Sequence, residues 1–276
     1  MHLTGSIVLY NSHDREVRQA VHSFLQIRMD KTLYLIDNSP RPTPLHPETA
    51  SRITHIHNRT NLGFGAGHNI ALHRALSNYN SPYHLVFNPD VSFEPQVITE
   101  LIAFMEHNPD IGLVMPQIRY PNGSLQFLCK LLPTPKDLIG RRFFPFLPAC
   151  KRHNRIYEMR FADYDQTMDV PFLSGSFMLL RTQAIQEAGM FDERYFLYME
   201  DADLCRRIGK KYRTVYYPRV SITHAYKKAS YKELKLLYHH MRSAILYFNK
   251  WGWLIDRERS RVNQQAVKRY SKAQEP

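Results

Sequence analysis

The sequence is poor in the residues that would mark several classes of protein. It has 3 cysteines in 276 residues, and none forms a Cys-x-x-Cys pair. This argues against a disulfide framework or a cysteine-based zinc site, and it fits a reducing compartment. Glycine, at 11 residues, is too scarce for a collagen-like or linker-like chain. No apolar run approaches the roughly 20 residues of a membrane-spanning helix.

A targeting signal is also missing from the first residues. Residues 6–10, Ser-Ile-Val-Leu-Tyr, are typical of a strand and lack the basic region and apolar core of a signal peptide. With 43% hydrophobic and 22% charged residues, the composition is that of a folded globular protein. We therefore expect a cytoplasmic protein.

Positive charge is concentrated at one end of the chain. The net charge is +12, but residues 1–204 carry a net −2 and residues 205–276 a net +14. Such asymmetry favours an anionic partner for the C-terminal part: nucleic acid, anionic lipid or a phosphorylated substrate. A solvated basic helical tail is the simpler alternative.

Short apolar runs alternate with amphipathic helical segments along the chain. Runs at 7–10, 33–36 and 85–87 each lead into polar turn residues, and helical patterns cover 16–26 and 69–78. This order predicts βαβ units and an α/β fold with a mostly parallel sheet. Further strands are expected at 112–115, 177–180, 214–217 and 220–222, and further helices at 96–106, 182–188 and 231–253. Ligands of such sheets bind beyond the carboxyl ends of the strands.

Three segments carry residues that suit chemistry. Residues 61–69, Asn-Leu-Gly-Phe-Gly-Ala-Gly-His-Asn, have alternating glycines that would let a ligand approach the backbone before a helix. Asn88-Pro89-Asp90 places a carboxylate at a strand end, where it could bind a hard cation such as Mg²⁺. A glycine turn and an Asn-Pro-Asp turn explain these two segments equally well.

The third segment is a dense acidic cluster. Glu200, Asp201 and Asp203 lie within four positions, between aromatic residues and two arginines. Crowded carboxylates raise one another's pKa, which suits a general base. Helix capping is the alternative, although it needs only one or two acids. His224 would matter only if it met Asp90 at one metal ion.

Together and in this order, these segments resemble glycosyltransferase family 2, the inverting enzymes with a GT-A fold. The matching motifs are residues 6–12, 37–39, 61–69, 88–90, 175–181 and 191–204. Within the family, the chain looks most like bacterial rhamnosyltransferases that extend lipid-linked polysaccharide precursors. The resemblance covers about residues 5–250. It implies a Rossmann-like GT-A catalytic domain at 1–228 and a basic helical extension at 229–276, associated with the membrane or the acceptor.

The resemblance also assigns roles by motif. Tyr10 and Asn11 would line the nucleoside pocket, and Asp37 would hydrogen-bond the base. The remaining nucleotide-sugar contacts would be Asn61, Gly63, Asn69, Asn88 and Arg206, with Arg207 as the alternative to Arg206.

The chemical roles follow in the same way. Asp90 matches the metal-binding DxD motif, in which Asn88 replaces the first aspartate, and His224 matches a further ligand for Mg²⁺ or Mn²⁺. Asp201 would be the general base, with Glu200 beside it on the acceptor side. Phe172 and Asp203 would contact the acceptor.

The expected reaction is inverting transfer, most simply of L-rhamnose from dTDP-L-rhamnose to a lipid-linked or growing polysaccharide acceptor. A UDP-sugar of glucose, galactose or N-acetylglucosamine is the rival donor. The basic end would hold the protein at the inner face of the cytoplasmic membrane, with Tyr247, Phe248, Trp251 and Trp253 at the interface.

Two other classes fit less well. The high pI of about 9.6 is compatible with nucleic-acid binding. That function would leave the acidic cluster unexplained, however, and no RNA-binding signature is present. We expect no nucleic-acid partner. A nucleotidyltransferase would carry a glycine- and arginine/lysine-rich phosphate loop near the N-terminus, where this chain has Tyr-Asn-Ser-His-Asp.

Overall fold

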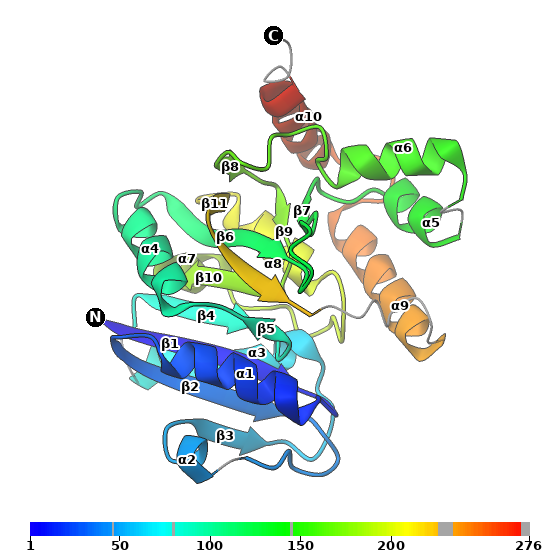
Figure 1. Ribbon diagram of the computed structural model, residues 1–276. Coiled ribbons are helices and arrows are strands. Elements are labelled where there is room, and N and C mark those ends of the chain that lie inside the picture. The colour runs from blue at the N-terminus through cyan, green and yellow to red at the C-terminus, as the bar shows by residue number, and fades with distance from the viewer. Residues whose placement is uncertain (46, 79–80, 144–145, 226–233, 272–276) are drawn as a thin grey trace.

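A computed structural model describes residues 1–45, 47–78, 81–143, 146–225 and 234–271. Its centre is a nine-stranded sheet with the order β3-β2-β1-β4-β10-β6-β11-β5, and β8 pairs with β11 (Figure 1). The strands of this sheet are β1 (His2–Leu9), β2 (Asp30–Asp37), β3 (Thr54–His57), β4 (Tyr83–Phe87), β5 (Val91–Ser92), β6 (Ile111–Arg119), β8 (Met168–Asp169), β10 (Phe177–Arg181) and β11 (Arg213–His224). A separate pair consists of β7 (Cys129–Lys130) and β9 (Phe172–Leu173).

Helices cover both faces of the sheet, with α1 and α4 on one side and α3, α7 and α8 on the other (Figure 1). The helices are α1 (Asp14–Leu25), α2 (Pro47–Ala50), α3 (Phe64–Asn78), α4 (Pro95–Glu106), α5 (Pro135–Phe143), α6 (Pro148–Tyr157), α7 (Thr182–Ala188), α8 (Glu200–Ile208), α9 (Leu234–Trp251) and α10 (Arg257–Ser271).

The predicted α/β fold with a mostly parallel sheet is confirmed. Strands β3, β2, β1 and β4 run parallel, and β6 runs parallel to β11. Strand β10 is inserted between β4 and β6 and is antiparallel to both. One detail was wrong: residues 214–217 and 220–222 belong to a single strand, β11, whose pairing with β6 shifts register between Tyr217 and Ser221.

Burial of both sheet faces explains why the strands are continuous apolar runs in the sequence. Leu3, Ile7 and Leu9 of β1 are fully buried, and so are Leu35 and Ile36, which are adjacent in β2 and point to opposite faces of the sheet. Because helices cover both faces, side chains of either parity are removed from water. Burying one such side chain stabilises the fold by about 1.5–3 kcal/mol. The sheet is thus a rigid base for the loops at its strand ends.

Both C-terminal helices pack on this core. Tyr247 and Phe248 of α9 are 0% and 2% exposed, so the prediction that they face a membrane was wrong. In the described parts of the chain, no helix combines the length and apolar character needed to cross a bilayer. The predicted domain boundary at residue 228 lies outside the described residues.

Candidate active site

The ends of β1 and β2 lie side by side, because Leu9 pairs with Asp37 in parallel register. Tyr10 follows β1 and is 44% exposed. Asn11 has a left-handed backbone with φ 48°, and its N–H donates to Ser39 Oγ at 2.9 Å. These two residues stand at an open edge of the sheet, as a nucleoside pocket requires. Their contact with a nucleoside stays a prediction.

Asp37 ends β2 and is fully buried. Its carboxylate accepts the N–H of Ser39 at 2.9 Å and that of Thr43 at 2.6 Å, and His55 Nε2 lies 3.3 Å from Oδ2. Burial opposes the charged form, but the hydrogen bonds from Thr43 and Ser39 outweigh it and hold the pKa of Asp37 below its usual value. The carboxylate therefore shapes the loop after β2, and its contact with a base stays a prediction.

The glycine loop packs against the protein itself. Gly63 has φ 90°, and a Cβ there would lie 2.2 Å from the carbonyl oxygen of Phe196. A Cβ on Gly67 would lie 2.7 Å from Val8 Cγ2. Asn61 Oδ1 accepts the N–H of Gly63 at 3.0 Å and holds the turn. The spaces in front of Gly63 and Gly67 are therefore filled by neighbouring chain segments, where the sequence analysis expected a ligand.

Asn69 was predicted to border the ribose and diphosphate, and the structure places it elsewhere. It is 3% exposed. Its Oδ1 accepts the N–H of Phe191 at 3.1 Å, and its Nδ2 donates to the carbonyl of Phe191 at 2.9 Å and to Glu193 Oε1 at 2.8 Å. Both ends of the amide are used, so Asn69 fixes the loop before α8 to α3.

Asn88, Asp90 and His224 meet at one point. His224 Nε2 lies 3.3 Å from Asp90 Oδ1 and 3.5 Å from Asn88 Nδ2. Strand β11 brings His224 there, because its end pairs with Val91 of β5. His224 therefore lies beside Asp90, as a shared metal ion would require, although 134 residues of sequence separate the two.

Gln126 is a residue of this site that the sequence analysis missed. Its Nε2 donates to the carbonyl of His224 at 2.7 Å, so its Oε1 faces His224 Nδ1 at 3.0 Å. Because Gln126 Oε1 accepts a hydrogen bond, it favours the His224 tautomer whose proton is on Nδ1. In that tautomer, the lone pair of Nε2 points toward Asp90. Nothing in the local sequence pattern indicated this, because Gln126 lies in a loop.

The donor set suits a hard cation held jointly with a ligand. Among the described residues, no group of three His, Cys, Asp or Glu side chains surrounds one point. Asp90 and His224, with the amide of Asn88, supply two or three ligands. Mg²⁺ typically uses one or two carboxylates and completes its shell with substrate phosphates and water. The residues present therefore fit Mg²⁺ or Mn²⁺ bound together with a diphosphate.

The acidic cluster begins α8. Asp201 is half-buried, and its Oδ2 accepts the N–H of Gly175 at 3.0 Å. Glu200 is 4% exposed, and its Oε2 has no hydrogen-bond partner among the described residues. Burial, reinforced by the charge of Asp201, raises the pKa of Glu200 well above its usual value. Burial also raises the pKa of Asp201, against the pull of Lys130. Of the two carboxylates, Asp201 is the one whose charged form is stabilised, by the N–H of Gly175 and the charge of Lys130.

A two-residue segment joins the acidic cluster to the Asp90 corner. Gly175 donates its N–H to Asp201, and the next residue, Ser176, accepts the N–H of Asn88 at 3.0 Å. Tyr198 and Met199, just before α8, have φ of 69° and 70°. Two consecutive left-handed residues that are not glycine are a strained turn of the kind that gathers at functional sites. The turn and the bridge fix where Asp201 points.

Three predicted contacts are wrong because the side chains serve the fold. Arg206 is buried and forms a bidentate pair with Asp256 at 2.6 and 2.7 Å, and Arg207 bonds Asp203 and the carbonyls that follow α7. Asp203 is 0% exposed and also accepts from Lys250 and Trp251 of α9. Neither arginine reaches a diphosphate, and Asp203 cannot touch an acceptor.

Phe172 also departs from its predicted role. Its ring is 5% exposed, and the ammonium of Lys130 lies over the ring at 4.9 Å from its centroid. The face that would stack on an acceptor sugar is therefore already covered.

Comparison with known proteins gives a consistent result. The model of the family "Glycosyl transferase family 2" matches residues 6–189. An N-acetylglucosaminyl-diphospho-decaprenol L-rhamnosyltransferase of Mycobacterium tuberculosis is 34% identical over 142 residues, covering 51% of this chain and 46% of that protein. The rhamnosyltransferase WbbL of Escherichia coli K12 is 28% identical over 151 residues, covering 53% and 54%. The chain spans about half the length of these curated relatives.

Solved structures share the fold. The fragment 1–349 of Staphylococcus aureus TarS superposes with a TM-score of 0.58 at 14% identity, covering 99% of this chain and 74% of that one. GalNAc-T7 with UDP, GalNAc and Mn²⁺ gives 0.59 at 14% identity, covering 81% and 43%. These neighbours are GT-A glycosyltransferases, and the family match extends over well more than half of the 276 residues. The chain belongs to glycosyltransferase family 2.

Proposed function

We propose that the protein is an inverting glycosyltransferase that moves a sugar from a nucleotide donor to a saccharide hydroxyl. The observation that carries this is the bridge at 175–176, which holds Asp201 on one side and the Asn88–Asp90–His224 corner on the other. A base and a diphosphate-binding corner on one rigid segment are the two parts that such a transfer needs.

In this mechanism, Asp201 takes the proton of the acceptor hydroxyl. The oxygen attacks the anomeric carbon from the face opposite the nucleoside diphosphate, the bond from that carbon to the diphosphate oxygen breaks, and the configuration inverts. Burial and the charge of Asp201 raise the pKa of Glu200, which favours its protonated form and leaves Asp201 as the base of the pair.

Asp90 and His224 would hold a divalent cation, with Asn88 beside them. When bound, Mg²⁺ or Mn²⁺ would neutralise the charge that develops on the departing diphosphate. Gln126 keeps His224 oriented for this, since its own amide is anchored by the carbonyl of the same histidine. Arg206 and Arg207 take no part.

Of the donors, dTDP-L-rhamnose is favoured, and a lipid-linked diphosphate saccharide or a growing polysaccharide is the favoured acceptor. The support comes from the M. tuberculosis and E. coli relatives, which are named as rhamnosyltransferases. The rival is a UDP-sugar, since UDP is bound in the TarS and GalNAc-T7 structures.

Calorimetry with dTDP-rhamnose, UDP-sugars and GDP-sugars, with and without Mn²⁺, separates these donors. We expect the tightest binding for dTDP-rhamnose. Asp90→Ala should weaken it at least tenfold, and Asp201→Asn should keep the affinity while abolishing transfer. A preference for UDP would discard rhamnose. Binding that is indifferent to Asp90 would refute the diphosphate corner.

We also propose that the protein lies on the inner face of the cytoplasmic membrane through α9. Tyr238, Met241 and Ile245 lie on one face of this helix and are 64%, 41% and 44% exposed. Beyond its end, Leu254 and Ile255 are 87% and 86% exposed. Adjacent bulky apolar side chains on a basic segment favour an anionic lipid surface.

Flotation with anionic and neutral vesicles tests this surface. The variant Ile245→Asp/Leu254→Asp should lose binding to anionic vesicles. Ile156→Asp changes an isoleucine that is 42% exposed on α6 and should bind as wild type does. Equal binding of all three proteins, or none by wild type at low salt, would refute the proposal.

A further inference from the structure

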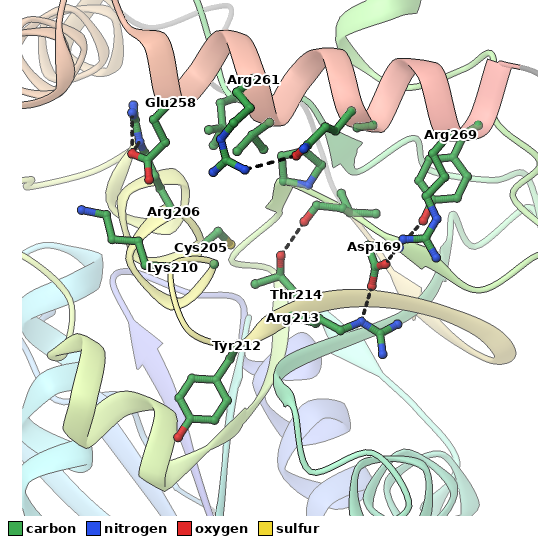
Figure 2. Close-up of a pocket in the computed structure, with 18 residues that line it drawn as sticks. Asp169, Cys205, Arg206, Lys210, Tyr212, Arg213, Thr214, Glu258, Arg261 and Arg269 are labelled. Atoms are coloured by element: carbon green, nitrogen blue, oxygen red, sulfur yellow. Dashed lines mark hydrogen bonds and ion pairs between the residues drawn. The ribbon is translucent and has the colours of Figure 1, made fainter.

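A cavity lies at the C-terminal end of α8, the end farther from Asp201. It has a volume of about 390 Å³ and is bounded by the last turn of α8, the start of β11 and the inner side of α10 (Figure 2). Small organic ligands occupy cavities of roughly 300–1,000 Å³. Because a helix rises 1.5 Å per residue, the end of α8 at Ile208 is roughly 10 Å along the helix axis from Asp201, and Lys210 follows that end. The Lys210 end of the cavity is therefore at the opposite end of α8 from Asp201.

Positive charge dominates its walls. They carry five cationic side chains and two carboxylates, an excess of three positive charges. The cationic residues are Arg206, Lys210, Arg213, Arg261 and Arg269, and the carboxylates are Asp169 and Glu258. This is a local excess in a fold whose first 204 residues are slightly acidic.

Both carboxylates are already engaged. Asp169 bonds Arg213 at 2.7 Å through one oxygen and Arg269 through the other. Glu258 bonds Arg206 at 2.9 Å. Both carboxylates on the cavity wall are thus paired with three of the five cations.

Lys210 and Arg261 are the two cations left over. Within the described part of the chain, neither forms an ion pair: Lys210 lies 4.9 Å from the centroid of the Trp251 ring, and Arg261 reaches only the side-chain oxygen of Gln265, at 3.4 Å. Figure 2 shows the guanidinium of Arg261 pointing from α10 into the cavity, and Lys210 beside Arg206 and Glu258. Both side chains are exposed, so an anion can reach them.

Apart from Thr214 and Gln265, the rest of the lining is apolar or aromatic. It includes Val170 and Pro171, and Val262, Ala266 and Tyr270 of α10. Guanidinium and ammonium groups together are typical partners of phosphate. We propose that this cavity binds a phosphate ester, with its phosphate at Lys210 and Arg261 and its organic part against the apolar wall. Either a free phosphorylated metabolite or a lipid headgroup could supply that group.

Two matched pairs of variants test the site. Lys210→Gln/Arg261→Gln removes the two unpaired cations. Lys211→Gln/Arg257→Gln removes the same charge from neighbouring exposed positions on the same two segments, outside the cavity. Calorimetry with inorganic pyrophosphate in metal-free buffer should show binding by wild type and by the control pair. The cavity pair should bind about tenfold more weakly or worse, since it loses charge-assisted hydrogen bonds.

Flotation with phosphatidic acid vesicles in phosphatidylcholine then separates the two sources. Weaker flotation of the cavity pair alone, with competition by pyrophosphate, would assign a lipid phosphate. Unchanged flotation with weaker pyrophosphate binding would assign a free phosphate ester. Equal losses in both pairs, or no loss in either assay for the cavity pair, would overturn the proposal. Circular dichroism should show all variants folded, because the replaced side chains are exposed.

Discussion

Replacing Arg206 by methionine separates a structural role from a role in diphosphate binding. The side chains of Arg206 and Asp256 are each 3% exposed, and they share two hydrogen bonds of 2.6 and 2.7 Å. Removing one partner of a buried pair costs about 3–5 kcal/mol, because the other charge is left unpaired. Arg259 lies 3.9 Å from the same carboxylate, which places the expected loss at the lower end, about 3 kcal/mol.

Thermal unfolding measures this loss. Unfolding entropy is roughly 2.1 cal/mol/K per residue, so about 3 kcal/mol in a chain of 276 residues lowers Tm by about 5 °C. The double variant Arg206→Met/Asp256→Asn removes the stranded charge but keeps a side chain that can accept the N–H of Arg259 at the start of α10, as Asp256 does at 2.9 Å. We expect it to recover about 1–3 kcal/mol of the loss.

Nucleotide affinity is the decisive second readout. Because Arg206 is buried against α10, both variants should bind the donor nucleotide as wild type does. A variant Arg206→Met that keeps its Tm but loses at least tenfold in nucleotide affinity would refute the structural assignment. It would also restore the expectation drawn from the family motif.

Three further predictions test the site and the fold around it. The pKa values of Glu200 and Asp201 are both raised, so a base in this pair becomes protonated, and kcat/KM falls, at a pH above the usual carboxyl range. A midpoint of the kcat/KM profile near pH 4 would contradict this. Gln126→Leu should weaken Mn²⁺ binding about 10–100-fold in electron paramagnetic resonance titrations, whereas unchanged affinity would show that His224 needs no such support. Gly63→Ala should destabilise the protein by more than about 1 kcal/mol in urea unfolding, because its Cβ would fall 2.2 Å from a carbonyl oxygen; an unchanged midpoint would mean that the loop relaxes freely.

Sequence patterns predicted the parts of the fold that depend on local periodicity. The buried runs of β1, β2, β4 and β10 are continuous apolar segments, and α4 and α7 begin and end close to the predicted positions. Strand β3, Thr-His-Ile-His, was missed because its residues are mostly polar and its side chains are only partly buried. Strands of two residues, such as β5 and β7, are too short to leave a period.

The candidate site was predictable to the extent that its residues lie in strand ends and motifs. Asp90 and His224 lie side by side, as the family resemblance implied, and their binding of a metal ion stays a prediction. On other elements, the partners of Arg206, Asn69 and Asp203 lie 47 to 124 residues away in sequence, and no local pattern encodes the packing of those elements. A charged or amide side chain in a motif looks the same whether it faces a ligand or a neighbouring helix.

Asp203 has a consequence for building chimeric enzymes. It lies two residues after the proposed base Asp201 in α8, and its carboxylate is neutralised by Arg207 of the same helix and by Lys250 of α9. The family match ends at residue 189, before either element. The stretch of chain that matches the family is therefore shorter than the packed unit that holds Asp201 in place. A hybrid that exchanges acceptor specificity should carry α8, α9 and α10 together, since a graft cut between them would strand a buried charge beside the reacting group.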